Sequence, residues 1–264
     1  MINCMSESEQ QVALTGILNV DSRMIMSKRS FTLVAGVSGS GKTDYLLNIA
    51  KNNAIKGKRV LFINLKNSVE ELSVRLMSIK SHVSFQKIVQ KRMTEQEWEQ
   101  VINSVEIMFY NINQNYLELK NIMSEIMTNS VDLVIIDDIQ MVEDEGNRFV
   151  KERMDYVLKN IKTIAVRLSV PVIGAYCISS KEVEKRADHR PLLSDLEYNG
   201  LLTYPDNIQL LYRDWMYNME SEQKNIEEIF IVKNMLGDIY CAKMAVVDGV
   251  CANLQDDIKS AMPC

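Results

Sequence analysis

Short runs of apolar residues alternate along the chain with stretches in which apolar residues recur every three or four positions. The runs have the length of buried strands, and they lie at 31–35, 60–65, 133–136, 171–176 and 208–212. The helical spacing predicts helices over 43–56, 70–79 and 149–168, and Thr94 with Glu97 predicts the start of another. This alternation predicts an α/β fold with a mostly parallel central sheet flanked by helices.

The last third of the chain differs, because its apolar runs follow one another with short connections. Runs at 229–232 and 240–247 predict an added C-terminal β-hairpin. A short strand is also expected at 107–110. We expect an N-terminal arm, an α/β domain and a C-terminal tail, over residues 1–30, 31–256 and 257–264.

The strand at 31–35 runs directly into a glycine-rich segment that matches G-x-x-x-x-G-K-[ST], with a helix after it. Its glycines let the backbone pass close to phosphates, and the helix N-terminus adds positive potential. The match predicts a P-loop for a nucleoside triphosphate, formed by Gly36, Val37, Ser38, Gly39, Ser40, Gly41, Lys42 and Thr43. Lys42 is expected to reach the β- and γ-phosphates, and Thr43 to ligate magnesium.

A P-loop enzyme also needs a carboxylate at the end of a neighbouring strand to hold the metal. The apolar run at 133–136 ends in Asp137, which we therefore predict as the second magnesium ligand. Asp138 follows directly and places a second carboxylate beside the first.

Further segments, together with these motifs, resemble the C-terminal RecA-like motor domain of DnaB-type replicative DNA helicases. The resemblance covers about residues 15 to 254 and has no counterpart of the family's N-terminal domain. The segments that carry it, in the order of the family, are 41–50, 94–98, 134–140, 170–172, 185–191, 194–196, Gly200 and 212–214.

The resemblance implies a RecA-like P-loop NTPase domain that binds ATP and Mg2+. Members of that family assemble as hexameric rings on single-stranded DNA, with nucleotide between subunits. By resemblance, this chain is expected to bind single-stranded DNA and to form a homo-oligomeric ring or associate with another helicase.

Three positions depart from the family pattern. The family's water-positioning Glu is replaced by Lys66, which cannot act as a base and carries the opposite charge. In the late K-x-R motif that reaches a neighbouring subunit's nucleotide, Lys233 is retained but Met235 replaces the arginine finger. The S-Q-L region reads Ala175-Tyr-Cys-Ile178, without its glutamine.

Asp138 could partly replace the lost Glu, because some other P-loop ATPases place their catalytic acid next to the metal carboxylate. We therefore take Lys42, Asp137, Asp138 and Lys233 as the candidate catalytic residues. The alternative interpretation of Asp138 is a solvated or helix-capping carboxylate.

Net charge and composition bear on possible DNA binding at one basic segment and on localisation. The net charge of −5 argues against nucleic-acid binding over the whole surface, but Lys181, Lys185, Arg186, His189 and Arg190 form a basic cluster that could face a DNA channel. The alternative is a solvated surface run. Neither a secretory signal nor a membrane-length apolar run is present, which favours the cytoplasm.

Two functions remain open. The leading one is an ATP-binding DnaB-like helicase motor that acts on single-stranded DNA in replication, with impaired hydrolysis left as a question. The alternative is a nucleotide-binding, weakly hydrolysing subunit or regulator of a helicase ring, which the replacements at Lys66 and Met235 favour.

Overall fold

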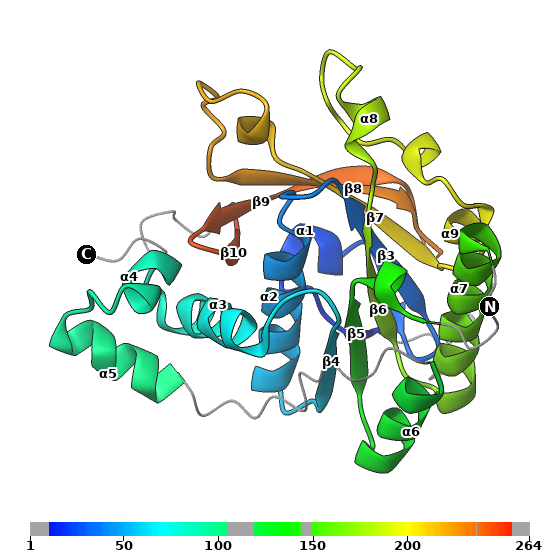
Figure 1. Ribbon diagram of the computed structural model, residues 1–264, viewed down its shortest axis with the longest axis horizontal. Coiled ribbons are helices and arrows are strands. Elements are labelled where there is room, and N and C mark those ends of the chain that lie inside the picture. Colours follow the sequence, from blue (N-terminus) through cyan, green and yellow to red (C-terminus); the bar gives the residue numbers. More distant parts are fainter. Residues whose placement is uncertain (1–10, 105–118, 144–148, 236, 255–264) are drawn as a thin grey trace, which may run out of the picture.

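A computed structural model describes residues 11–104, 119–143, 149–235 and 237–254 of the protein. Its centre is an eight-stranded sheet in the order β10-β9-β8-β7-β3-β6-β5-β4 (Figure 1). The strands are β3 (Phe31–Gly36), β4 (Val60–Asn64), β5 (Leu133–Asp137), β6 (Val172–Cys177), β7 (Asn207–Tyr212), β8 (Ile226–Lys233), β9 (Tyr240–Val247) and β10 (Val250–Asn253).

The sheet combines a parallel part and an antiparallel part. Strands β4, β5, β6, β3 and β7 pair in parallel, whereas β8, β9 and β10 extend the sheet antiparallel from β7. The prediction of a mostly parallel sheet with a C-terminal hairpin is confirmed, and β10 adds a third strand to that extension. The predicted strand at 107–110 lies outside the described residues.

The helices cover both faces of the sheet. The predicted helices are present as α2 (Lys42–Ile55), α3 (Val69–Ser81), α5 (Glu95–Ser104) and α7 (Val150–Leu168). At the start of α5, Thr94 and Glu97 form the expected capping box, with the Glu97 amide donating to Thr94 Oγ1 at 3.2 Å and the Thr94 amide to Glu97 Oε2 at 2.9 Å. Helices that the spacing did not predict are α1 (Leu18–Asp21), α4 (Phe85–Val89), α6 (Leu119–Asn129), α8 (Ser180–Val183) and α9 (Asn199–Thr203).

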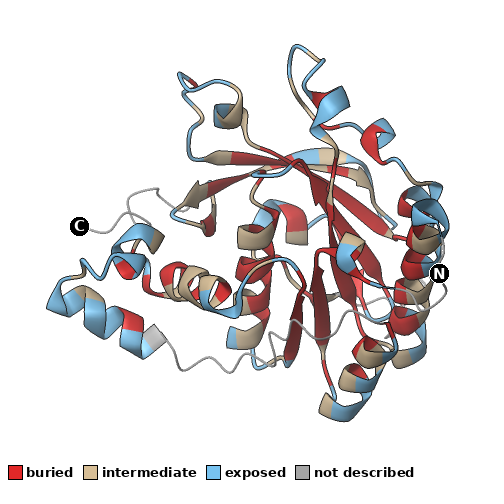
Figure 2. Ribbon diagram, in the orientation of Figure 1, coloured by how far each residue is buried: buried red, intermediate tan, exposed pale blue. Residues whose placement is uncertain are grey.

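Burial on both faces explains why the central strands read as unbroken apolar runs. Successive residues of β3, Leu33 and Val34, belong to two different core clusters on opposite faces. One cluster lies under α6 and α7 and the other under α1 and α2, and Figure 2 shows the strands buried between them. A third, small cluster of Val83, Ile88 and Val101 joins α3, α4 and α5.

The segment before residue 31 packs into the domain from residue 11 onward. Its strands β1 (Gln11–Ala13) and β2 (Met26–Ser27) pair antiparallel, and Ile17 and Val20 are buried in the core shared with α2. Asn53 of α2 holds the segment, because its side-chain amide accepts from the Leu14 N–H at 3.1 Å and donates to the Leu14 carbonyl at 2.7 Å. These residues are therefore integrated in the fold, while the domain boundary at residue 31 stays a prediction.

Replacement of Asn53 by Ala should destabilise the protein by about 1–3 kcal/mol, because it leaves two partly buried backbone groups of Leu14 without their Asn53 partner. Urea unfolding measures this loss. Asn160→Ala is the control, since that amide bonds a carbonyl of its own helix, and it should change stability by less than about 0.5 kcal/mol. Equal effects of the two substitutions would contradict the anchoring role of Asn53.

Candidate nucleotide-binding site

The P-loop lies at the carboxyl end of β3, between β3 and α2. All six residues of β3 are buried, and the strand pairs with β6 on one side and β7 on the other. Gly41 caps α2 in the left-handed conformation with φ of 89°, which glycine adopts without a Cβ penalty. The loop therefore presents its amides and the first turn of α2 at one edge of the sheet, as the sequence predicts.

Gly41 is also required by its surroundings. A Cβ at this position would lie 2.2 Å from Nη2 of Arg213 and 2.6 Å from Oε2 of Glu227. Arg213, which follows β7, donates to Glu227 of β8 at 2.8 Å, and the Glu227 side chain is fully buried. Burial raises the pKa of Glu227 to about 7, against the opposing effect of Arg213. This buried ion pair forms the wall against which the P-loop turns.

Lys42 is almost completely buried, with 6% of its surface exposed. Its Nζ donates to the carbonyl oxygens of Gly36 at 2.7 Å and Val37 at 2.8 Å. Burial lowers the pKa of Lys42, and the positive charge of Lys66 lowers it further. The ammonium is thus held inside the curve of the P-loop by backbone oxygens.

Thr43 and Asp137 meet as the sequence predicts. The Thr43 hydroxyl donates to Oδ2 of Asp137 at 2.6 Å, which joins the first turn of α2 to the end of β5. Asp137 is buried, and this burial raises the pKa of its carboxyl group. A hydroxyl and a carboxylate oxygen are the hard oxygen ligands that Mg2+ prefers, so the pair fits a magnesium site.

Asp138 caps the short 3-10 helix η2 (Ile139–Met141), because its Oδ1 accepts from the Gln140 amide at 3.1 Å. The carboxyl group is buried, and burial raises its pKa to about 6. The structure thus shows the capping role that the sequence left open, and a buried rather than solvated carboxylate. A catalytic role for Asp138 stays a prediction.

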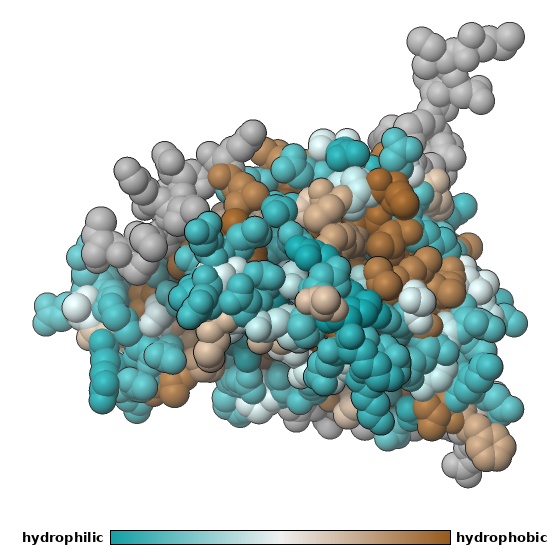
Figure 3. All heavy atoms as spheres, turned by 90° about the horizontal axis from the view of Figure 1, so that it is seen from above, coloured by the Kyte–Doolittle hydropathy of each residue, from teal (hydrophilic) through white to brown (hydrophobic). Residues whose placement is uncertain are grey.

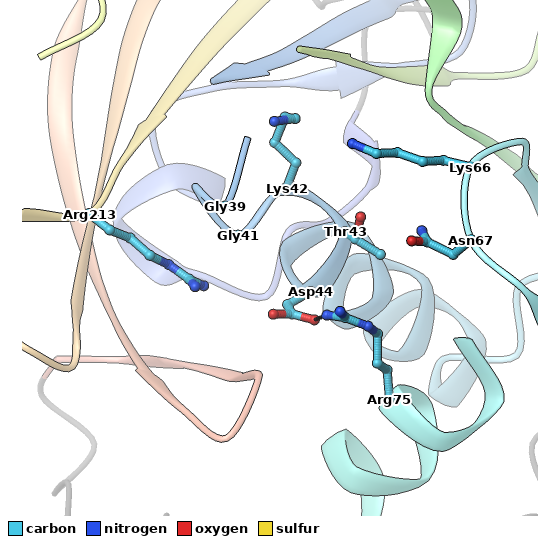
Figure 4. Close-up of a pocket in the computed structure, with 9 residues that line it drawn as sticks. All are labelled: Gly39, Gly41, Lys42, Thr43, Asp44, Lys66, Asn67, Arg75 and Arg213. Atoms are coloured by element: carbon cyan, nitrogen blue, oxygen red, sulfur yellow. Dashed lines mark hydrogen bonds and ion pairs between the residues drawn. The ribbon is translucent and has the colours of Figure 1, made fainter. Parts of the chain in front are cut away.

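A cavity of about 330 Å3 opens beside the P-loop (Figure 4). In Figure 4 the Lys66 side chain extends into it toward Lys42, and Arg213 enters from the opposite side. Arg75 bridges from α3, where its guanidinium donates to Asp44 at 2.8 Å. The lining residues are Gly39, Gly41, Lys42, Thr43, Asp44, Lys66, Asn67, Arg75 and Arg213.

Two smaller cavities, each of about 180 Å3, also border Asp44. One lies between Arg213, Trp215 and the β9–β10 turn, and the other reaches Phe85. Sequence reasoning missed Asp44 and Arg213 as cavity residues. The available signals were the position of Asp44 directly after the P-loop and the inclusion of Arg213 in the matched segment 212–214.

Lys233 lies far from this cavity within one chain. It ends β8 and pairs with Ile208 at the start of β7, at the edge of the sheet opposite the P-loop. Its Nζ donates to the Leu202 carbonyl at 2.8 Å, near the end of α9. Met235, which occupies the place of the arginine finger, is 45% exposed. Neither residue lines the cavity beside the P-loop of its own chain.

The predicted basic cluster is partly neutralised by carboxylates from other parts of the chain. Arg186 donates to Asp195 at 2.9 Å, and Arg190 donates to Glu228 at 3.0 Å. Arg190 also lies over the ring of Tyr212 at 4.8 Å. Arg190 thus holds the loop between α8 and α9 against β8, whereas Arg186 joins two parts of that loop.

The other members of the cluster behave differently. The His189 ring stacks on Tyr217 with 4.4 Å between centroids, whereas Lys181 and Lys185 are exposed. Figure 3 looks onto this side of the molecule and shows a hydrophilic surface at its centre, with a hydrophobic area toward the right. Lys185 pairs with the equally exposed Glu182, a contact of little energetic weight.

Comparison with known proteins finds similarity over most of the chain. Residues 14–251 match the family of DnaB-like helicase C terminal domains. The chain belongs to this family. The DnaB-like domain superposes on a solved ATPase domain of another protein with a TM-score of 0.84 at 26% identity, covering 95% of this chain and 94% of that one.

Two further similarities concern longer proteins. The replicative DNA helicase DnaB of Geobacillus stearothermophilus is 28% identical over 248 residues, which is 88% of this chain and 54% of that protein. A DnaB-like replicative helicase studied for its interactions with primase gives a TM-score of 0.85 at 27% identity, covering 93% of this chain and 63% of the other. The DnaB-like domain thus spans about half the length of the curated relatives it matches. Among the described residues, no helix has both the length and the apolar character of a membrane span.

Gly41→Ala should abolish nucleotide binding, because the new Cβ would displace the Arg213–Glu227 wall and the P-loop with it. Gly57→Ala is a matched control, since Gly57 has a similar φ of 79° and nothing within 4 Å of an added Cβ. Both should lose about 1–2 kcal/mol of stability from the left-handed backbone. Binding of a fluorescent ATP analogue measures the loss of the site, and thermal unfolding measures the loss of stability. Retained binding in Gly41→Ala would refute the proposed packing.

Proposed function

We propose that this DnaB-like domain binds Mg-ATP and works as the motor of a replicative helicase on single-stranded DNA in the cytoplasm. The observation that carries the proposal is the contact between Thr43 and Asp137 at an intact P-loop. This contact brings the two predicted magnesium ligands together from different parts of the chain. The names of the curated relatives, replicative DNA helicases, support the assignment to DNA replication.

Different residues of the site would bind different parts of the nucleotide. The P-loop amides and Lys42 would hold the phosphates, and Thr43 with Asp137 would hold the magnesium ion. When bound, the ion neutralises charge on the phosphate oxygens. Lys42 already lies at the end of the loop where phosphate oxygens can replace the carbonyls of Gly36 and Val37 as its partners.

The position of Lys233 supports a ring. Because it lies at the sheet edge opposite the P-loop, it can serve only the nucleotide of a neighbouring copy. We therefore propose a hexameric ring in which each nucleotide lies between two subunits. Association with a different helicase subunit is the alternative, and mass measurement in solution with and without ATP distinguishes the two.

A second function is favoured by one observation, the presence of Lys66 where the family has its catalytic glutamate. An ammonium cannot accept a proton from water, so this position cannot supply a base. The domain would then be a nucleotide-binding regulator of a helicase ring. Steady-state ATP hydrolysis with and without single-stranded DNA, measured beside ATP binding, decides between the two. DNA-stimulated turnover supports the motor, and tight binding without turnover supports the regulator.

Asp138→Ala should abolish the ATP hydrolysis that remains in this domain if Asp138 supplies the missing base. The rate should fall by about 100-fold or more, the usual contribution of a positioned general base. The readout is phosphate release at saturating ATP. Since Asp138 caps η2, a thermal unfolding curve should accompany it, and an unchanged rate in a folded variant would remove Asp138 from the mechanism.

The DNA-contacting residues should be Lys181 and Lys185 rather than the arginines, because only the lysines are exposed and without a buried carboxylate partner. The double variant Lys181→Ala, Lys185→Ala should weaken binding of single-stranded DNA. Each lost phosphate contact should reduce the slope of log affinity against log salt by about 0.7. Replacement of Lys151 and Lys159, exposed on α7, is the control and should leave the slope unchanged.

A further inference from the structure

Four cationic side chains line the cavity beside the P-loop, and three of them are bound to other protein groups. Lys42 donates to two backbone carbonyls, and Arg213 donates to the buried Glu227. Arg75 donates to both Asp44 and Glu71. These three cations are held by the domain itself, which limits their freedom to follow a ligand.

The fourth cation is Lys66. Its ammonium makes no hydrogen bond or ion pair with any residue that the structure describes, and its side chain is exposed in the cavity and directed toward Lys42 (Figure 4). Its charge nevertheless acts on its surroundings, because it favours the ionised forms of Asp137 and Asp138 and opposes that of Lys42. Among the described residues, Lys66 therefore has no partner, and its positive charge faces the proposed phosphate site.

The backbone that carries Lys66 is fixed. The buried Asn64 accepts from the amides of Lys66 at 3.3 Å and Asn67 at 3.0 Å, and it donates to the Asn67 carbonyl at 2.6 Å. The Leu65 amide donates to the Asp137 carbonyl at 2.7 Å. The turn is thus tied to the strand end that carries the predicted magnesium ligand, so only the Lys66 side chain is left to adapt.

The position of Lys66 indicates which end of a bound nucleotide it would face. Lys42 and Thr43 line the part of the cavity where the terminal phosphates lie in a P-loop, and the Lys66 side chain is directed toward Lys42. Thr43 in turn contacts Asp137. Arg213 lies across the loop, beside Gly41. With phosphates bound in this order, a diphosphate would leave the position next to Lys66 empty, whereas a triphosphate would fill it.

We infer that Lys66 is a ligand of the γ-phosphate and makes this site discriminate ATP from ADP. The inference rests on the proposed ATP site and deepens it. An ammonium at this position stabilises the bound triphosphate through a charge-assisted hydrogen bond, while it provides no group that accepts a proton from water. The residue thus changes the site from one that promotes cleavage to one that retains the uncleaved nucleotide.

The test compares the affinities of the full chain for a non-hydrolysable β,γ-imido ATP analogue and for ADP, both with Mg2+, by competition against a fluorescent nucleotide. Lys66→Ala should weaken binding of the triphosphate by about 10- to 100-fold, the range for a hydrogen bond between charged groups, and change ADP binding by less than about twofold. Lys66→Arg should keep most of the preference for the triphosphate over ADP. Lys159→Ala, on exposed α7, should behave as the unaltered chain.

The outcomes separate this inference from the proposed function. Equal weakening of both nucleotides, or no weakening of either, would overturn the role of Lys66 while leaving the ATP site in place. Failure of the unaltered chain to bind either nucleotide would overturn the ATP site itself. Lys66→Glu should bind the triphosphate more weakly than Lys66→Ala, and the reverse order would also reject a charge-based preference.

Discussion

The placement of β3 between β6 and β7 is the constraint on which the nucleotide site depends. Every residue of β3 is buried, so a shift of one position would exchange the two apolar sets that its faces present to the cores. The P-loop therefore begins at a fixed point. The adjacent strands end at the same edge, where β7 delivers Arg213 and β5, one strand beyond β6, delivers Asp137. The order of the strands therefore determines where the site lies, and the side chains act at that place.

The sequence predicts those parts of the molecule whose signal is local. Central strands such as β4 and β5 are buried on both faces and so appear as continuous apolar runs. The P-loop is recognised residue by residue because phosphate binding depends on backbone amides within one short segment. The segment before residue 31 lacks such a signal, since it is held by Asn53 and by apolar residues without a regular period.

Long-range pairing accounts for what the sequence does not reveal. Arg213 and Glu227 meet because β7 and β8 run antiparallel, and nothing in either segment alone indicates the contact. The basic cluster at 181–190 is interpreted from its own charges, while the carboxylates that neutralise its arginines, Asp195 and Glu228, come from later in the chain. Asp138 shows the same limit, because its burial and its capping of η2 emerge only from the packed structure.

The cavity combines features that act on different states of a bound nucleotide. In the proposed function, the P-loop, Lys42 and the Thr43–Asp137 pair would bind phosphates and metal in the ground state. Faster cleavage would require groups that act more strongly in the transition state, such as a base or an added positive charge at the leaving oxygen. If Lys66 binds the γ-phosphate, it stabilises the bound triphosphate in the ground state and supplies no base. Affinity and turnover are therefore separable properties of this site.

The location of Lys233 at the sheet edge opposite the P-loop has a consequence for how copies of the domain communicate. The P-loop lies at one end of the parallel strands and Lys233 at the other, so the two ends of the domain present different surfaces. Contacts between such copies are head-to-tail, so the surface each one offers differs from the surface it receives. In the proposed ring, the nucleotide of one copy would contact the neighbour on one side alone, so that signals between subunits would pass around the ring in a single direction.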